Sequence, residues 1–133
     1  MKGVMDIKSP QRVLIVDDEP LICWSITETL ASCGDIVTDA KNGEEALCAM
    51  SNTGDPIDVV LLDYSLPDAQ DLTLLATLRR VSPRTRMILM SVHYTDEMAT
   101  AALALGATRV VSKPINMDDI PSLVHGVASR PPE

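Results

Sequence analysis

Aromatic residues are almost absent from this sequence of 133 residues: they make up 2% of it, and phenylalanine does not occur. A hydrophobic core must therefore be built from Val, Ile, Leu, Met and Ala, which supply most of the 46% hydrophobic content. The charged share of 23% is ordinary for a folded globular protein and does not resemble a disordered chain. The length predicts a single domain with one core.

Long apolar runs and paired cysteines are also missing. No stretch of about 18 apolar residues occurs, so no membrane-spanning helix is predicted, and the segment after Met1 does not resemble a signal peptide. Cys23, Cys33 and Cys48 are too widely spaced for a paired-cysteine or zinc motif. We expect them to be buried thiols in a protein of the reducing cytoplasm.

Positive charge is scarce as well. The formal net charge is −8, which would repel the phosphate backbone of a nucleic acid over most of the surface. The composition therefore argues against direct nucleic-acid binding by this segment.

Short apolar runs alternate with segments that have helical periodicity. Because the runs are continuously apolar, we expect both faces of each strand to be buried, as in a parallel sheet covered by helices. Five strand–helix repeats with right-handed connections predict a doubly wound α/β fold, a three-layer (βα)5 sandwich. Residues 1–10 are interpreted as a lead-in, 11–128 as the domain and 129–133 as a tail or the start of a linker. The five apolar runs are residues 13–16, 36–37, 59–62, 87–90 and 110–111.

Helix boundaries are indicated by prolines, capping residues and glycines. Pro20 suits a first helical turn and Gly34 a helix end, whereas Asn42 is a candidate N-cap. Pro121 indicates that the last helix begins near Asp119.

Two further expectations concern the fourth and fifth helices. Thr95 is predicted to cap the fourth, with Met98, Ala102 and Leu105 facing inward. His125 is expected to be exposed on the fifth.

Polar side chains follow four of the predicted strands. Asp17 and Asp18 follow the first, Asp63 the third, Ser91 the fourth and Lys113 the fifth. Each could by itself be a cap, a turn residue or a solvated charge. In a doubly wound sheet, however, ligands bind beyond the carboxyl ends of the strands, so their joint placement favours one functional site.

The predicted cluster indicates metal-assisted phosphoryl chemistry. Two carboxylates about 4 Å apart repel each other by about 4 kcal/mol at an effective dielectric constant of 20, so the cluster needs a counter-charge. Oxygen donors without His or thiolate suit a hard cation, and a site with room for water and phosphate favours Mg²⁺ over Ca²⁺. Asp63 is the candidate nucleophile, with Lys113 as a point charge and Ser91 as a hydroxyl donor to phosphoryl oxygens.

The motifs around these residues carry a family resemblance. Residues 13–20 read VLIVDDEP, residues 61–67 read LLDYSLP and residues 112–114 read SKP, with Ser91 between the last two. In this order they resemble the receiver domains of response regulators, the CheY-like superfamily of two-component signalling, over about residues 12–128. The resemblance implies a flavodoxin-like sheet of order 2-1-3-4-5 and a signalling domain rather than a conventional enzyme.

The resemblance also implies the roles of individual residues. A sensor histidine kinase would phosphorylate Asp63, and Mg²⁺ would be bound by Asp18, Asp63 and the backbone carbonyl of Ser65, with Asp17 acting through water. A cis peptide bond is implied between Lys113 and Pro114. Family precedent places a dimer or partner surface on the fourth helix, fifth strand and fifth helix.

One departure from the family pattern affects the expected switch. Most receivers carry Tyr or Phe at the position of Val110, whose β-branched side chain has no ring to move. Our hypothesis is that the readout depends instead on Ser91 and residues 92–95. Ser65 and His93 occupy positions that tune phosphoryl lifetime in the family; His93 could be a general base or a surface imidazole, and we favour the latter.

Two other functions compete with a phosphorylated receiver. A phosphohydrolase of the haloacid-dehalogenase type would need a second Asp two residues after its nucleophile, where this chain has Ser65. A pseudo-receiver, an interaction domain that is not phosphorylated, is disfavoured by the complete set of acidic residues, Ser91 and Lys113. An output domain, for example for transcription regulation, could follow residue 133; the cognate kinase is not indicated by the sequence.

Overall fold

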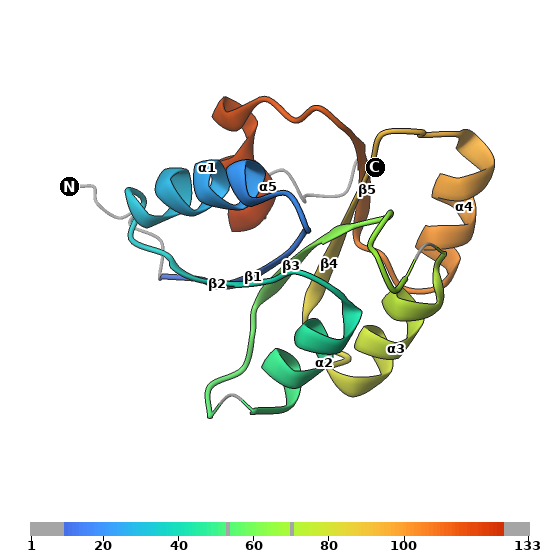
Figure 1. Ribbon diagram of the computed structural model, residues 1–133, viewed down its shortest axis with the longest axis horizontal. Coiled ribbons are helices and arrows are strands. Elements are labelled where there is room, and N and C mark those ends of the chain that lie inside the picture. Colours follow the sequence, from blue (N-terminus) through green and yellow to red (C-terminus); the bar gives the residue numbers. More distant parts are fainter. Residues whose placement is uncertain (1–9, 53, 70, 127–133) are drawn as a thin grey trace.

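The computed structural model describes residues 10–52, 54–69 and 71–126, in which strands and helices alternate along the chain (Figure 1). The strands are β1 (Arg12–Val16), β2 (Ile36–Ala40), β3 (Val59–Asp63), β4 (Arg86–Ser91) and β5 (Arg109–Ser112). The helices are α1 (Pro20–Ala31), α2 (Gly43–Asn52), α3 (Thr73–Val81), α4 (Asp96–Ala104) and α5 (Ile120–His125), with a 3₁₀ turn at Met117–Asp119.

All five strands form one parallel sheet in the order β2-β1-β3-β4-β5, which confirms the predicted doubly wound topology. The chain order reverses between β1 and β3, which lie next to each other with Val16 opposite Leu62. This is the switch point of the sheet, where a doubly wound fold binds its ligands. Each of the five predicted apolar runs lies within a strand.

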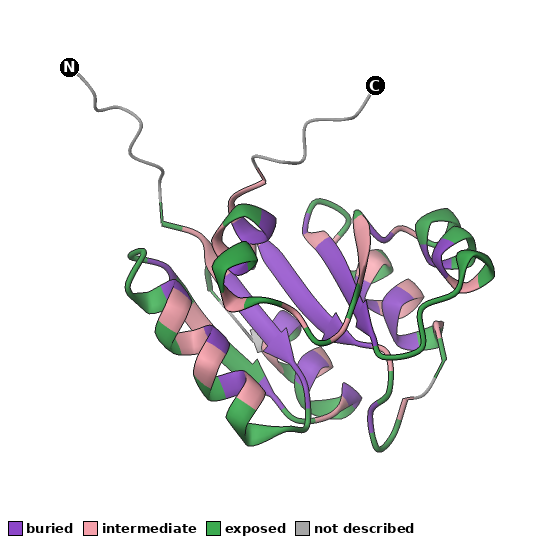
Figure 2. Ribbon diagram, turned by 90° about the horizontal axis from the view of Figure 1, so that it is seen from above, coloured by how far each residue is buried: buried purple, intermediate pink, exposed green. Residues whose placement is uncertain are grey.

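The helices cover both faces of the sheet, α1 and α5 on one side and α2, α3 and α4 on the other (Figure 1). Alternate residues of one strand therefore enter different cores: Leu14 and Val16 pack toward α2 to α4, whereas Val13 and Ile15 pack toward α1 and α5. The central strands β1, β3 and β4 are buried along their length except at Arg12 and Arg86, the first residues of β1 and β4 (Figure 2). Burial on both faces explains why the strand sequences are continuously apolar.

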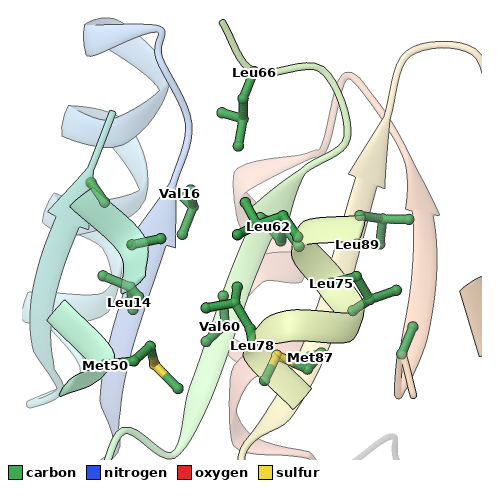
Figure 3. Close-up of a cluster of buried hydrophobic side chains, with 14 of the residues drawn as sticks. Leu14, Val16, Met50, Val60, Leu62, Leu66, Leu75, Leu78, Met87 and Leu89 are labelled. Carbon is green, nitrogen blue, oxygen red and sulfur yellow. The ribbon is translucent and has the colours of Figure 1, made fainter. Parts of the chain in front are cut away.

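Leucine, valine, isoleucine and methionine fill these cores, as the composition predicts. On the face of α2 to α4, Met50 and Met87 close the end of the cluster away from Leu66 (Figure 3). Methionine suits this use because its flexible side chain fills irregular space. Within the described residues, the largest fully buried members of this cluster are Leu14, Leu62, Leu66, Leu75, Leu78, Met87 and Leu89.

The predicted helix ends are confirmed. Asn42 Oδ1 accepts the N–H of Glu45 at 2.8 Å, and Thr95 Oγ1 accepts the N–H of Met98 at 3.1 Å. Gly34 follows α1 with a positive φ of 91°. The fifth helix begins at Ile120 after an N-cap at Asp119, as Pro121 indicates.

Three residues that we expected to be buried are exposed, namely Cys33, Cys48 and Leu105. Of the three cysteines only Cys23 is buried, because Cys33 lies beyond the end of α1 and Cys48 lies two residues from the inward Ala46 and Met50, on the opposite side of α2. Leu105 is 42% exposed because α4 ends at Ala104, one residue before it.

His125 is not the exposed residue that we expected. Its side chain is 11% exposed, and its Nε2 lies 2.9 Å from Oδ2 of the buried Asp35. The last turn of α5 packs beside α1, which brings His125 to the connection between α1 and β2. A contact over this sequence separation leaves no local pattern from which burial could be read.

None of the helices in the described part of the chain is long and apolar enough to cross a membrane.

Candidate functional site

The predicted acidic residues converge at the carboxyl ends of β1 and β3. Asp17 and Asp18 follow β1, and Asp63 is the last residue of β3. Because β1 and β3 are adjacent and parallel, with Val16 opposite Leu62, Asp17 and Asp63 end up side by side. Carboxylate oxygens of Asp17, Asp18 and Asp63 lie within 4.8 Å of one another. Asp17 and Asp63 are buried, whereas Asp18 is exposed.

Lys113 supplies the positive charge of the cluster. Its Nζ lies 3.1 Å from Asp17 Oδ2, 3.6 Å from Asp63 Oδ1 and 3.5 Å from Glu19 Oε1. Its backbone N–H donates to the carbonyl oxygen of Ser91 at 2.8 Å, which fixes the end of β5 beside that of β4. The Lys113–Pro114 peptide bond is cis, as the family resemblance implies.

The electrostatics of the cluster are unbalanced. Burial, followed by the charge of Asp17, raises the pKa of Asp63 to about 6, although Lys113 and the Ser65 N–H favour its ionised form. Burial alone would lower the pKa of Lys113, but the hydrogen bond to Asp17 and the nearby carboxylates outweigh it and raise that pKa. One ammonium group therefore faces more negative charge than it can neutralise.

The acidic cluster opens to solvent through a depression of about 350 Å³. Its walls carry polar groups from the ends of β1, β3 and β5 together with a few apolar side chains. The lining residues are Asp18, Glu19, Ile22, Asp63, Ser65, Val92, Lys113 and Pro114.

Ser65 lies on the loop that follows β3, and Ser91 is the last residue of β4. The backbone N–H of Ser65 donates to Asp63 Oδ1 at 3.3 Å, which holds the carboxylate against its own loop. Ser91 is 2% exposed, and its Oγ accepts the backbone N–H of His93 at 3.1 Å. Since Oγ is the acceptor there, its proton stays available for donation to another group. His93 is exposed, in line with the favoured interpretation of a surface imidazole.

Two residues beside the site, Glu19 and Cys23, were given no role in the sequence analysis. Glu19 forms an ion pair with Lys113, its Oε1 lying 3.5 Å from Nζ, and the Cys23 thiol donates to the backbone carbonyl of Asp17 at 3.3 Å. Burial and the charge of Asp17 raise the pKa of Cys23 to about 11, so this thiol stays protonated at neutral pH. The sequence signal for both is their nearness to the acidic pair: Glu19 follows Asp18 directly as the N-cap of α1, and Cys23 lies in the first turn of that helix.

The donor set fits a hard divalent cation. Asp18 and Asp63 offer carboxylate oxygens, the Ser65 carbonyl belongs to the adjoining loop, and neither thiolate nor imidazole is part of the cluster. Such oxygen ligands suit Mg²⁺, which keeps several of its waters and needs few protein ligands.

The doubly wound sheet thus brings three carboxylates and a lysine together at its switch point, where this fold binds its ligands. Residues 13–125 match the sequence family described as response regulator receiver domain. The chain therefore belongs to the receiver domains of two-component response regulators, which are signalling domains and not conventional enzymes.

Known proteins similar to this chain agree with the assignment. The DNA-binding transcriptional regulator NtrC of Salmonella typhimurium is 31% identical over 118 residues, which cover 89% of this chain and 25% of NtrC. This chain thus spans about a quarter of that relative.

Solved structures of receivers share the fold. A CheY-like receiver domain protein from Methanospirillum hungatei superposes with a TM-score of 0.82 at 27% identity, covering 91% of this chain and 95% of that one. A response regulator from Burkholderia pseudomallei, described with a phosphorylated aspartic acid and a calcium ion, has a TM-score of 0.79 at 25% identity and covers 90% of this chain and 69% of that one.

Proposed function

We propose that this domain is a phosphorylation-dependent switch in which Asp63 accepts a phosphoryl group from a sensor histidine kinase in a Mg²⁺-dependent reaction. The observation that carries the proposal is the convergence of Asp17, Asp18 and Asp63 within 4.8 Å, with Lys113 Nζ 3.6 Å from Asp63 Oδ1. A carboxylate in this setting can form an acyl phosphate.

The metal would be held by Asp18, Asp63 and the Ser65 carbonyl, with Asp17 acting through water. When bound, Mg²⁺ supplies charge neutralisation for carboxylates and phosphoryl oxygens. The excess negative charge of the cluster supports this assignment, since Lys113 alone leaves it unbalanced.

In the transfer step a carboxylate oxygen of Asp63 forms a bond to phosphorus while the bond from phosphorus to the donor breaks. The electron pair of the broken bond leaves with the donor, a histidine imidazole of the kinase or acetate when acetyl phosphate is used. Lys113 offers its ammonium charge and Ser91 its hydroxyl proton to the phosphoryl oxygens. The reverse fate, hydrolysis, would be tuned by Ser65 and His93 through water access.

The signal would be read through the loop after β4. Val110 is half-buried in the core beside α4 and carries no ring, so Ser91 and residues 92–95 are the segment that we expect to move when Ser91 binds a phosphoryl oxygen. Backbone amide shifts recorded with and without a phosphoryl analogue should change most in 91–95. Unchanged shifts in that loop would contradict this readout.

Partners and context follow from the family. The partners would be a sensor kinase and a second copy of this domain, bound through α4, β5 and α5. An output domain would follow residue 133. The relative NtrC is by its name a DNA-binding transcriptional regulator, which supports a DNA-binding output domain. The domain would comprise residues 11–128, and the formal net charge of −8 of the whole sequence argues against nucleic-acid contacts by this segment. We assign it to the cytoplasm, where such kinases act.

The test is incubation with acetyl phosphate, followed by mass spectrometry of the intact protein. We expect a mass gain of one phosphoryl group with Mg²⁺ and none when EDTA replaces the metal, because the uncompensated carboxylates repel the phosphoryl donor. Absence of modification in both conditions would favour the pseudo-receiver, and modification that is independent of metal would contradict the assigned site.

A further inference from the structure

Asp68 joins the β3–α3 loop to the start of α2. Its Oδ1 accepts the backbone N–H of Gly43 at 2.7 Å, and its Oδ2 accepts the N–H of Glu44 at 3.2 Å. Both oxygens of one carboxylate thus bind the first N–H groups of a helix that lies far away in the sequence. A carboxylate at this position also interacts favourably with the positive end of the helix dipole.

The start of α2 is shaped to receive this carboxylate. The next N–H, that of Glu45, is capped by Asn42, so side chains satisfy the first three donors of the helix. A Cβ atom at Gly43 would lie 3.2 Å from Asp68 Oδ1 and 3.3 Å from a methyl carbon of Leu74. Both distances are tighter than ordinary contacts, so glycine at this position allows Asp68 to approach.

The segment that Asp68 anchors also carries Ser65. Leu66 and Ala69 exchange two backbone hydrogen bonds, of 2.9 Å and 3.3 Å, which close the intervening residues into one turn. Leu66 holds one side of this turn in the core, at 2% exposure (Figure 3). Asp68 holds the other side, and with both ends fixed the turn cannot rotate without moving the adjoining Ser65.

We propose that Asp68 is a positioning residue for the acidic site: its bond to α2 fixes the β3–α3 loop so that the Ser65 carbonyl faces the metal. This inference rests on the proposed function, because it assigns the loop a role in binding Mg²⁺. Nothing in the family motifs around Asp63 points to it, since the motif ends at Pro67.

Asp71 provides a matched control on the same loop. It also uses a carboxylate oxygen to cap a helix, accepting the N–H of Thr73 at 2.9 Å, but this contact is local to α3. Replacing Asp71 with Ala therefore removes a charge and a cap from the loop without releasing it from α2.

The experiment compares the Mg²⁺ affinities of wild type, Asp68→Ala, Asp68→Asn and Asp71→Ala at a temperature where all four are fully folded. Calorimetric titration gives the affinity, and the fluorescence of Trp24 gives a second readout because this residue lines a depression together with Asp17 and Asp18. We expect Asp68→Ala to weaken Mg²⁺ binding by about tenfold, the lower end of losses seen when groups that orient metal ligands are removed. Asp68→Asn, which keeps one acceptor oxygen, should lie between Asp68→Ala and wild type.

A purely structural role for Asp68 would lower the melting temperature but leave the Mg²⁺ affinity of the folded protein unchanged. Equal affinities for Asp68→Ala and wild type, or equal losses for Asp68→Ala and Asp71→Ala, would overturn the positioning role. Wild-type protein that bound no Mg²⁺ would instead overturn the proposed function itself, and the two failures are therefore distinguishable.

Discussion

Asp63→Asn is expected to abolish the phosphoryl mass gain produced by acetyl phosphate and Mg²⁺. The amide nitrogen and oxygen of Asn are poor nucleophiles, whereas the carboxylate of Asp63 is a nucleophile and has Lys113 Nζ 3.6 Å away. Intact-protein mass spectrometry measures the modified fraction, which should fall from a large part of the wild-type protein to none.

The matched control for this loss is Asp39→Asn. Asp39 is an exposed carboxylate at the end of β2 that lines a depression with Asp17 and Asp18 but does not belong to their cluster. We expect this variant to be modified like wild type. Equal modification of the Asp63→Asn protein would place the phosphoacceptor elsewhere.

The Asp63→Asn variant should also remain folded, so that loss of modification cannot be attributed to unfolding. The folded-state pKa of Asp63, about 6, lies above its ordinary value because of burial and the charge of Asp17. The contribution of this carboxylate to stability is therefore present at acidic pH and lost as the pH rises through about 6. Removing the charge should leave the metal-free melting temperature at neutral pH equal or higher.

Lys113→Met is expected to give the largest loss of stability, about 3 kcal/mol in the free energy of unfolding of the metal-free protein. The ammonium contacts Asp17 and Asp63, which are 1% and 6% exposed, and its removal leaves buried carboxylates without their charge partner. Breaking a buried pair from one side typically destabilises a protein by this amount. Urea unfolding in EDTA measures the difference.

Mg²⁺ should restore part of this stability, because a cation bound only by the folded protein stabilises it and can replace the lost charge. The gain on adding Mg²⁺ is therefore expected to be larger for Lys113→Met than for wild type. Lys41→Met is the control, since Lys41 is an exposed lysine beside the same rim of the sheet. Equal stabilities of the Lys113→Met and wild-type proteins would show that the lysine does not balance the cluster.

Much of the fold could be predicted because its causes are local. The apolar runs that became β1, β3 and β4 are continuous since helices cover both faces of these strands. Thr95 and Asn42 cap their helices through bonds to residues three positions later, a spacing visible in the chain. The edge strand β2 extends three residues beyond its predicted apolar run, to Ala40. Its end is set by backbone pairing with β1, whereas most of its side chains are exposed.

Long-range contacts escaped prediction. His125 pairs with Asp35, and Lys113 pairs with Glu19. Asp68 binds the start of α2, from which β3 separates it in the sequence. These partners are separated by many residues, and their side chains are of types that are common on surfaces. Only the packing of the elements brings them together.

The amino-acid sequence by itself determined the strand and helix order, the aliphatic core and the acidic and basic residues of the site, because periodicity and the placement of polar residues at strand ends are properties of neighbouring positions. The tertiary structure alone decided that Lys113 meets Asp17 and Asp63, that one lysine leaves the cluster short of positive charge, and that Asp68 binds the start of α2. Distances and burial depend on the folded path of the whole chain, which local patterns do not specify.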